Sequence, residues 1–163
     1  RHNSTNKGIL TIMQANVGRG RISHNLALQL AHENNAEILL IQEPWTYSDL
    51  TTKQSATHPS YDTFSPLLTW HIRPRVLTYV KKAQNLQPFQ YSTEISPDFL
   101  KITIIGSNHQ KLRIWNVYNA PPNCINPGAG LHAMFSSSEN PFFIGGDFNL
   151  KHASWDSSST YTL

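Results

Sequence analysis

Apolar residues occur in short runs along the chain, and the spacing within each run predicts a strand or a helix. Residues 9–17 alternate apolar and polar positions, which is typical of a strand. Residues 38–41 are all apolar, which predicts a strand covered on both faces. Between them we expect a helix capped by Ser23, with Leu28 outside an apolar stripe made of Ile22, Leu26, Ala27, Leu30 and Ala31. This β-α-β order indicates parallel neighbouring strands.

Residues 46–60 are polar and irregular, and a series of strand-like segments follows them. These segments are residues 64–72, 75–81, 89–95, 100–106 and 112–118. Because turn signals rather than helices separate them, we expect antiparallel hairpins. Residues 128–135 are predicted to form a short helix ahead of a last strand at 142–144. The pattern therefore predicts a single α/β domain over residues 1–163, with two mostly antiparallel sheets.

The composition is typical of a globular protein but does not indicate a particular function. The 163 residues are 39% hydrophobic, enough for a core, and the net charge of +3 permits a polyanionic partner without arguing for one. Cys124 is the one cysteine, so a reducing compartment, nuclear or cytoplasmic, is the default. No apolar run is long enough to cross a membrane, and no signal peptide opens the sequence. Because the sequence begins at Arg1 without Met and stops soon after its richest motif, we expect a piece of a longer chain.

The richest motif is the segment Phe-Phe-Ile-Gly-Gly-Asp-Phe-Asn at 142–149. Its apolar start predicts a strand buried on both faces, and the two glycines would let backbone or a ligand approach closely. Asp147 and Asn149 are two positions apart, so an extended chain points both side chains to one face. The same residues are good turn formers, and taken alone the motif favours a functional site and a strand-end turn equally.

Four predicted strands end in polar side chains of complementary chemistry. They supply two carboxylates (Glu43 and Asp147), two carboxamides (Asn16 and Asn149) and a phenol (Tyr118). The edge where such strands end is where α/β sheets gather ligands. Carboxylates suit a hard divalent cation, and amides and a phenol can donate to phosphoryl oxygens. The set therefore predicts a site for a metal ion and a phosphate ester.

These motifs resemble the endonuclease/exonuclease/phosphatase family, which includes apurinic endonucleases and deoxyribonuclease I, and within it the endonuclease domain of non-LTR (LINE-type) retrotransposons. The resemblance rests on Gln-Ala-Asn at 14–16, Ile-Gln-Glu-Pro-Trp at 41–45, Arg-Val-Leu-Thr-Tyr-Val at 75–80, Asn-Val-Tyr-Asn-Ala-Pro at 116–121 and Gly-Asp-Phe-Asn-Leu-Lys-His-Ala-Ser-Trp at 146–155. It implies a four-layered α/β sandwich with two packed, mostly antiparallel sheets.

The resemblance also implies a role for each residue of the site. Glu43 would be the principal metal ligand, supported by Asn16, with Mg²⁺ as the cofactor and Mn²⁺ as a substitute. Asp147 would orient or deprotonate the attacking water, Asn149 would hold the scissile phosphate, and Tyr118 would contact it in the transition state. The implied reaction is hydrolysis of a DNA phosphodiester that leaves a 3′-hydroxyl, used as a primer by a downstream reverse transcriptase domain.

The chain also departs from the family pattern. A later Asp and a Ser-Asp-His motif complete the family's site, and neither occurs before Leu163. Two alternatives to the endonuclease therefore stay open: an inactive, truncated copy that at most binds nucleic acid, and a family relative that acts on another phosphodiester or phosphomonoester.

Four residues outside the central set are candidates for DNA contact. Arg73 and Arg75 could face phosphates, and His152 and Trp155 could line the DNA groove. A charged hairpin edge is the structural alternative for the arginines, and packing beneath the active-site loop is the alternative for His152 and Trp155.

Overall fold

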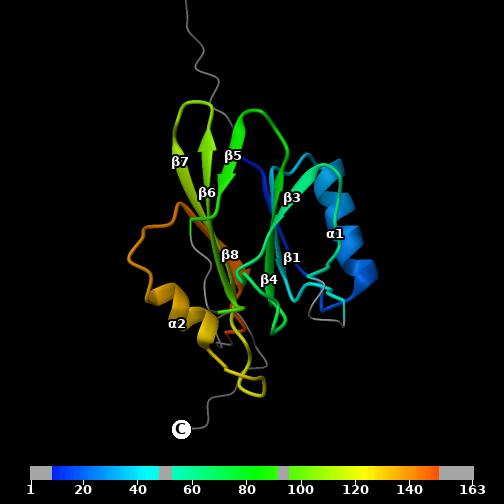
Figure 1. Cartoon of the computed structure of the whole chain (residues 1–163), viewed down its shortest axis with the longest axis vertical. Helices are drawn as coiled ribbons and strands as arrows, with labels where there is room; N and C mark the ends of the chain where they lie inside the picture. Colours follow the sequence, from blue (N-terminus) through cyan, green and yellow to red (C-terminus); the bar gives the residue numbers. More distant parts are fainter. Residues whose placement is uncertain (1–8, 48–52, 92–95, 151–163) are drawn as a thin grey trace, which may run out of the picture.

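The computed structural model describes residues 9–47, 53–91 and 96–150, which form two four-stranded sheets and two helices (Figure 1). The first sheet has the order β1-β2-β4-β3. Its strands are β1 (Ile12–Asn16), β2 (Ile38–Gln42), β3 (Tyr61–Phe64) and β4 (Val76–Lys81). β1 and β2 are parallel and α1 (Arg21–Glu33) connects them, so the predicted β-α-β opening is confirmed. β4 is antiparallel to both β2 and β3.

The second sheet has the order β5-β6-β7-β8. It contains β5 (Leu86–Phe89), β6 (Phe99–Gly106), β7 (Lys111–Tyr118) and β8 (Phe143–Asp147). β5, β6 and β7 form antiparallel pairs, whereas β8 runs parallel to β7 after the connection through α2 (Ala129–Phe135). Each sheet therefore has two antiparallel pairings and one parallel pairing.

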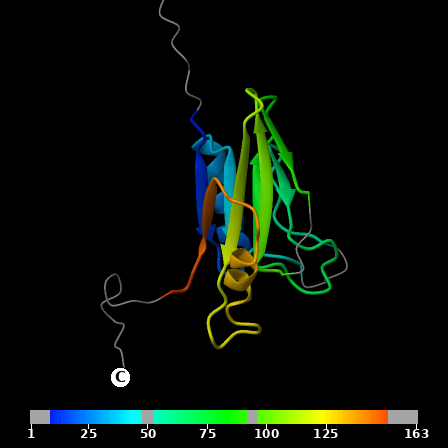
Figure 2. The ribbon, with the colours of Figure 1, turned by 90° about the vertical axis from the view of Figure 1, so that its left-hand side faces the viewer.

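The layers follow the order α1, first sheet, second sheet, α2, and Figure 1 shows them from the side, with α1 on the right and α2 on the left. Figure 2 looks onto the second sheet from the side that carries α2. The continuous apolar run of β2 serves two cores, because successive side chains of a strand point to opposite faces. Leu39 and Ile41 pack toward α1, and Ile38 and Leu40 pack toward the second sheet. The four-layered α/β sandwich with two mostly antiparallel sheets is confirmed.

The helix α1 buries Ala27 and Ala31 of the predicted stripe but leaves the large residues of that stripe exposed. Ile22 is 86% exposed and Leu26 55% exposed, whereas Leu28, expected to lie off the stripe, is 1% exposed. The helix begins at Arg21 after Gly20, so Ser23 is not its cap. The prediction was wrong because it counted histidine as polar: His24 is fully buried on this helix and shifts the buried face toward Leu28.

Two strand boundaries and one burial prediction were also wrong. The run at 64–72 contributes only its first residue to β3, because Leu67 and Trp70 are buried by loop packing against the core beneath α1. The run at 89–95 ends as a strand at Phe89, and residues 92–95 lie outside the described part. β8 was expected to be covered on both faces, but it is an edge strand whose Phe143 and Ile144 are each 37% exposed.

Neither helix in the described part of the chain has the length and apolar character needed to cross a membrane.

Candidate active site

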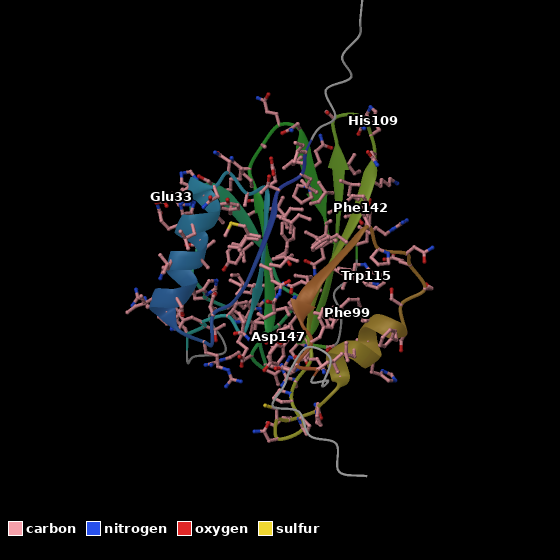
Figure 3. All side chains as sticks on the ribbon, turned by 180° about the vertical axis from the view of Figure 1, so that it is seen from behind. Glu33, Phe99, His109, Trp115, Phe142 and Asp147 are labelled. Atoms are coloured by element: carbon pink, nitrogen blue, oxygen red, sulfur yellow. The ribbon has the colours of Figure 1, made fainter. Side chains whose placement is uncertain are left out.

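The site lies where strands of both sheets end, at the opposite end of the second sheet from the β6–β7 turn that carries His109 (Figure 3). Asn16 at the end of β1 is its central connection. The amide nitrogen of Asn16 donates to Oδ2 of Asp147 at 2.7 Å and to Oε2 of Glu43 at 3.2 Å. Its carbonyl oxygen Oδ1 accepts a hydrogen bond from the backbone of Gly18 at 2.9 Å, which fixes the orientation of the amide. One side chain thus brings two carboxylates from different sheets together.

Glu43 is held in an unfavourable backbone conformation directly after β2. Its φ of 48° lies in the left-handed region, which costs a non-glycine residue about 1–3 kcal/mol. The surrounding chain compensates, because the Glu43 amide donates to the carbonyl of Arg75 and the Glu43 carbonyl accepts from the amide of Arg19. The guanidinium of Arg19 also lies 3.5 Å from Oε1 of Glu43. These contacts turn the carboxylate toward Asn16.

Tyr118, the last residue of β7, faces the same carboxylate. Burial, followed by the nearby charge and hydrogen bond of Glu43, raises the pKa of Tyr118 to about 12. The phenol is protonated at neutral pH, and its O–H donates a hydrogen bond to the Glu43 carboxylate. On its other side, the guanidinium carbon of Arg75 lies 5.6 Å from the centre of the Tyr118 ring.

Asp147 and Asn149 form the turn rather than the extended pair that the motif predicts, and their role in a functional site stays a prediction. Oδ1 of Asp147 accepts from the Asn149 amide at 3.1 Å, and Asn149 has a φ of 44°. Asn119 holds this turn, because its amide donates to the Asp147 carbonyl, its side chain donates to the Phe148 carbonyl, and its own carbonyl accepts from Nδ2 of Asn149.

The glycines before Asp147 allow close packing of the backbone. A Cβ at Gly146 would lie 2.1 Å from the carbonyl oxygen of Val117, and a Cβ at Gly145 would lie 2.5 Å from the side chain of Leu40. Gly145 and Gly146 therefore let β8 approach β7 and the core, and the neighbour they admit is backbone and core rather than a bound ligand.

The oxygen ligands of the site suit a hard cation. Glu43 and Asp147 converge on one amide, and two carboxylates together with waters form a typical environment for Mg²⁺. No group of three or more His, Cys, Asp or Glu that could hold a metal ion occurs in the parts of the chain that the structure describes. Asn16 turns its nitrogen rather than its oxygen to the carboxylates, so its role as a metal ligand stays a prediction.

Comparison with known proteins identifies the family. The model of the endonuclease/exonuclease/phosphatase family matches residues 13–163. The chain belongs to this family.

Two solved structures of low sequence identity share the fold of this family member. The endonuclease domain of TRAS1, a telomere-specific non-LTR retrotransposon, matches with a TM-score of 0.67 and 18% identity over 90% of this chain. TDP2 of D. rerio, complexed with a single-strand DNA product, matches with a TM-score of 0.55 and 16% identity over 88% of this chain. The present chain spans 62% of the length of each of those two chains. Among curated proteins, none matches the sequence.

Two of the four residues predicted to contact DNA in this family member, Arg73 and Arg75, lie in the described part of the chain. Arg75 forms an ion pair with the fully buried carboxylate of Asp98, so its guanidinium has a partner inside the protein. Arg73 is half-buried in the loop ahead of β4. His152 and Trp155 lie outside the described residues. The DNA-contact role of all four residues stays a prediction.

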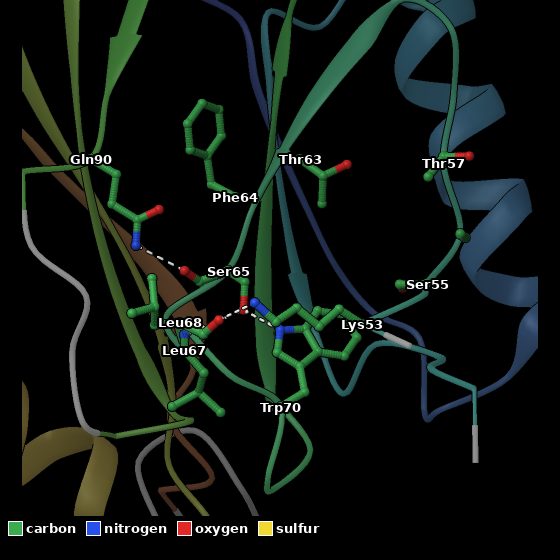
Figure 4. Close-up of a pocket in the computed structure, with 11 residues that line it drawn as sticks. Lys53, Ser55, Thr57, Thr63, Phe64, Ser65, Leu67, Leu68, Trp70 and Gln90 are labelled. Atoms are coloured by element: carbon green, nitrogen blue, oxygen red, sulfur yellow. Dashed lines mark hydrogen bonds between the residues drawn. The ribbon is translucent and has the colours of Figure 1, made fainter. Parts of the chain in front are cut away.

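A separate pocket of about 360 Å³ lies beside β3 and contains none of the five site residues (Figure 4). Trp70 is among its lining residues, is only 6% exposed and donates its indole N–H to Ser65. Its side chain is therefore mainly a core residue, as expected for a tryptophan beside a strand.

Three residues that support the site carry no signal in the sequence. Gln14 and Asn119 lie inside recognised motifs but received no role, and Asp98 was not singled out at all. Each acts through a hydrogen bond or an ion pair with a residue distant in sequence, and hydrophobic periodicity carries no signal for such a contact.

Proposed function

We propose that this chain is the endonuclease part of a retrotransposon-type protein and that it nicks DNA in a metal-dependent reaction. Family membership supports the coarser statement, a hydrolase that acts on phosphodiester bonds. The similarity to a retrotransposon endonuclease domain favours DNA as the substrate, and under this proposal a reverse transcriptase uses the new 3′-hydroxyl. We further propose that residues 1–163 belong to one domain and act inside the cell, in the nucleus or cytoplasm.

The observation that carries the proposal is the bridge from Asn16 to both Glu43 and Asp147. Two carboxylates this close repel each other and an incoming phosphate, and a divalent cation would offset both repulsions. Mg²⁺, with Mn²⁺ as a substitute, is the proposed cofactor, held chiefly by Glu43 with support from Asn16. Bound there, it would neutralise phosphate charge and make a bound water more acidic.

The side chains around this centre have complementary proposed roles. Asp147 would orient or deprotonate the attacking water, and hydrogen bonds at both of its carboxylate oxygens fix its position for that role. Tyr118, whose O–H donates to Glu43 in this structure, would turn it to a non-bridging phosphate oxygen in the transition state. Asn149 has one side-chain N–H engaged by Asn119, and its second N–H would hold the scissile phosphate.

The test is nicking of supercoiled plasmid by the purified chain in Mg²⁺, in Mn²⁺ and in chelator. Asp147→Asn and Glu43→Gln change one carboxylate each, and we expect the nicking rate to fall by about 100-fold or more in both. Glu33→Gln removes an exposed carboxylate of α1, distant from Asp147, and serves as the matched control (Figure 3). Equal rates in wild type, Asp147→Asn and Glu43→Gln would contradict the proposal.

Two further substrates separate the alternatives. A folded chain that binds plasmid without cleaving it would match the inactive copy, and preferential cleavage of an inositol phosphate or of a lipid phosphodiester would match a relative with another substrate. We expect plasmid DNA to be cleaved fastest.

A further inference from the structure

Gln14 makes an unusual pair of hydrogen bonds between the two sheets. It lies on β1, the edge strand of the first sheet, and faces Gly146 on β8, the edge strand of the second sheet. Its side-chain nitrogen Nε2 donates to the Gly146 carbonyl at 2.7 Å, and its side-chain oxygen Oε1 accepts from the Gly146 amide at 2.9 Å. The carboxamide thus satisfies both backbone groups of one residue, as a neighbouring strand would do.

The local sequence makes this contact possible. A Cβ at Gly145 would lie 3.1 Å from Oε1 of Gln14, which is shorter than most contacts that a Cβ makes in proteins. The absence of a side chain at this position therefore lets the Gln14 amide reach the backbone of β8.

The contact is made at Gly146, the residue directly before Asp147, whose carboxylate is the proposed catalytic group. Gln14 and Asn16 are two apart on β1, so both side chains project from the same face, and their partners Gly146 and Asp147 are consecutive on β8. Gln14 holds the main chain of β8, while Asn16 holds the carboxylate that follows. The backbone contact locates Asp147, so its carboxylate need not itself hold the two sheets in register.

The placement of β8 relative to β1 is important because the residues of the site come from both sheets. Glu43 follows a strand of the first sheet, and Asp147 belongs to the second. In the buried interior, Nε2 of Gln42 donates to Oδ1 of Asn116 and ties the sheets together at 2.7 Å. Gln14 adds a contact at their exposed edges, beside the hydrogen bond from Asn16 to Asp147. These edge contacts set the position of β8 next to β1, where the buried contact does not reach.

We infer that Gln14 is a positioning residue that fixes Asp147 relative to Asn16 and Glu43. The inference rests on the proposed endonuclease function and identifies a residue on which its rate depends. An error of about 1 Å in the placement of a catalytic group can cost about 100-fold in rate. Gln14→Met keeps the length of the side chain and removes both hydrogen bonds. We expect it to lower kcat for plasmid nicking by about 10- to 100-fold.

The control is Gln29→Met, which removes a glutamine hydrogen bond on the surface of α1. For Gln14→Met we expect KM to stay within about threefold and the melting temperature to stay within a few degrees of Gln29→Met, because exposed groups contribute little to stability. A role in stability alone would instead lower the melting temperature and leave kcat unchanged.

Amide exchange at Gly146, measured by NMR, reports the contact without requiring activity, and we expect it to accelerate at least about tenfold in Gln14→Met. Unchanged exchange, or unchanged kcat in Gln14→Met when wild type nicks DNA, would overturn the inference while leaving the proposed function intact. No metal-dependent nicking by folded wild type would overturn the proposed function itself, and the catalytic role of Gln14 with it.

Discussion

His24 provides a quantitative test of how the fold supports the segment that carries Glu43. The ring is fully buried, its Nδ1 accepts from the amide of Trp45 at 3.2 Å, and its Nε2 lies 3.0 Å from the hydroxyl of Tyr79. Because that hydroxyl donates to the carbonyl of Ala56, it must accept from Nε2–H of the histidine. The arrangement therefore requires the neutral imidazole with its hydrogen on Nε2.

Acidification should destabilise the protein through this one side chain. Burial lowers the pKa of His24 from 6.5 to about 4. The unfolded chain then binds a proton at a higher pH than the folded chain does, so this contribution to stability is complete above pH 6.5 and is lost as the pH falls toward 4. At about 1.4 kcal/mol per pH unit, the interval corresponds to a loss of about 3 kcal/mol. That loss is a large share of the roughly 5–15 kcal/mol that stabilises a typical domain.

The assay is urea denaturation at several pH values between 4 and 7. His24→Gln removes the titrating group, so its free energy of unfolding should fall by about 3 kcal/mol less than that of wild type over this range. His109→Gln, in the exposed turn between β6 and β7, should keep the wild-type slope. A His24 pKa above 6 measured by NMR, or equal slopes in wild type and His24→Gln, would refute the reasoning.

Three further substitutions test other contacts. Asp98→Asn leaves the guanidinium of Arg75 facing a neutral amide, and urea denaturation should show a loss of about 3 kcal/mol; a loss below about 1 kcal/mol would contradict a stabilising buried pair. Gly146→Ala forces β8 away from a backbone carbonyl of β7, so both the melting temperature and the nicking rate should fall; a wild-type melting curve would contradict the close approach. Asn119→Leu removes the side-chain hydrogen bond that holds the turn after β8, together with a buried Oδ1 that has no partner among the described residues. Nicking should slow about tenfold while stability changes by less than about 1.5 kcal/mol, and the reverse pattern would show that the side chain only stabilises the fold.

Much of the fold could be predicted because the strands bury their side chains in a periodic way. The run at Ile38 to Ile41 indicated a strand between two cores, and the structure shows one core on each of its faces. The buried face of α1 was predicted only in part, because one polar residue of this helix is buried. His24 is polar by class, yet it is buried because both ring nitrogens have partners, and this changes which face of α1 packs inward.

The candidate site could be assembled only in part from the sequence. Asn16 and Asp147 each end a strand and Glu43 follows one, and the structure links both carboxylates through the amide of Asn16. The contribution of Gln14 could not be predicted, because its partner is a backbone group 132 positions away and no side-chain pattern marks it. The ion-pair partner of Arg75 could not be predicted for the same reason. The sequence suggested a DNA phosphate as a partner for Arg75, and the structure pairs its guanidinium with Asp98.

The most direct test of one shared site is a double-mutant cycle on Mg²⁺-dependent nicking with Glu43→Gln and Asp147→Asn. Groups that act as a unit are strongly non-additive, because the first loss already removes what both provide. We therefore predict that the double variant nicks DNA no more than about threefold more slowly than the slower single variant. Two losses that multiply, as for independent positions, would contradict a single centre built from both sheets.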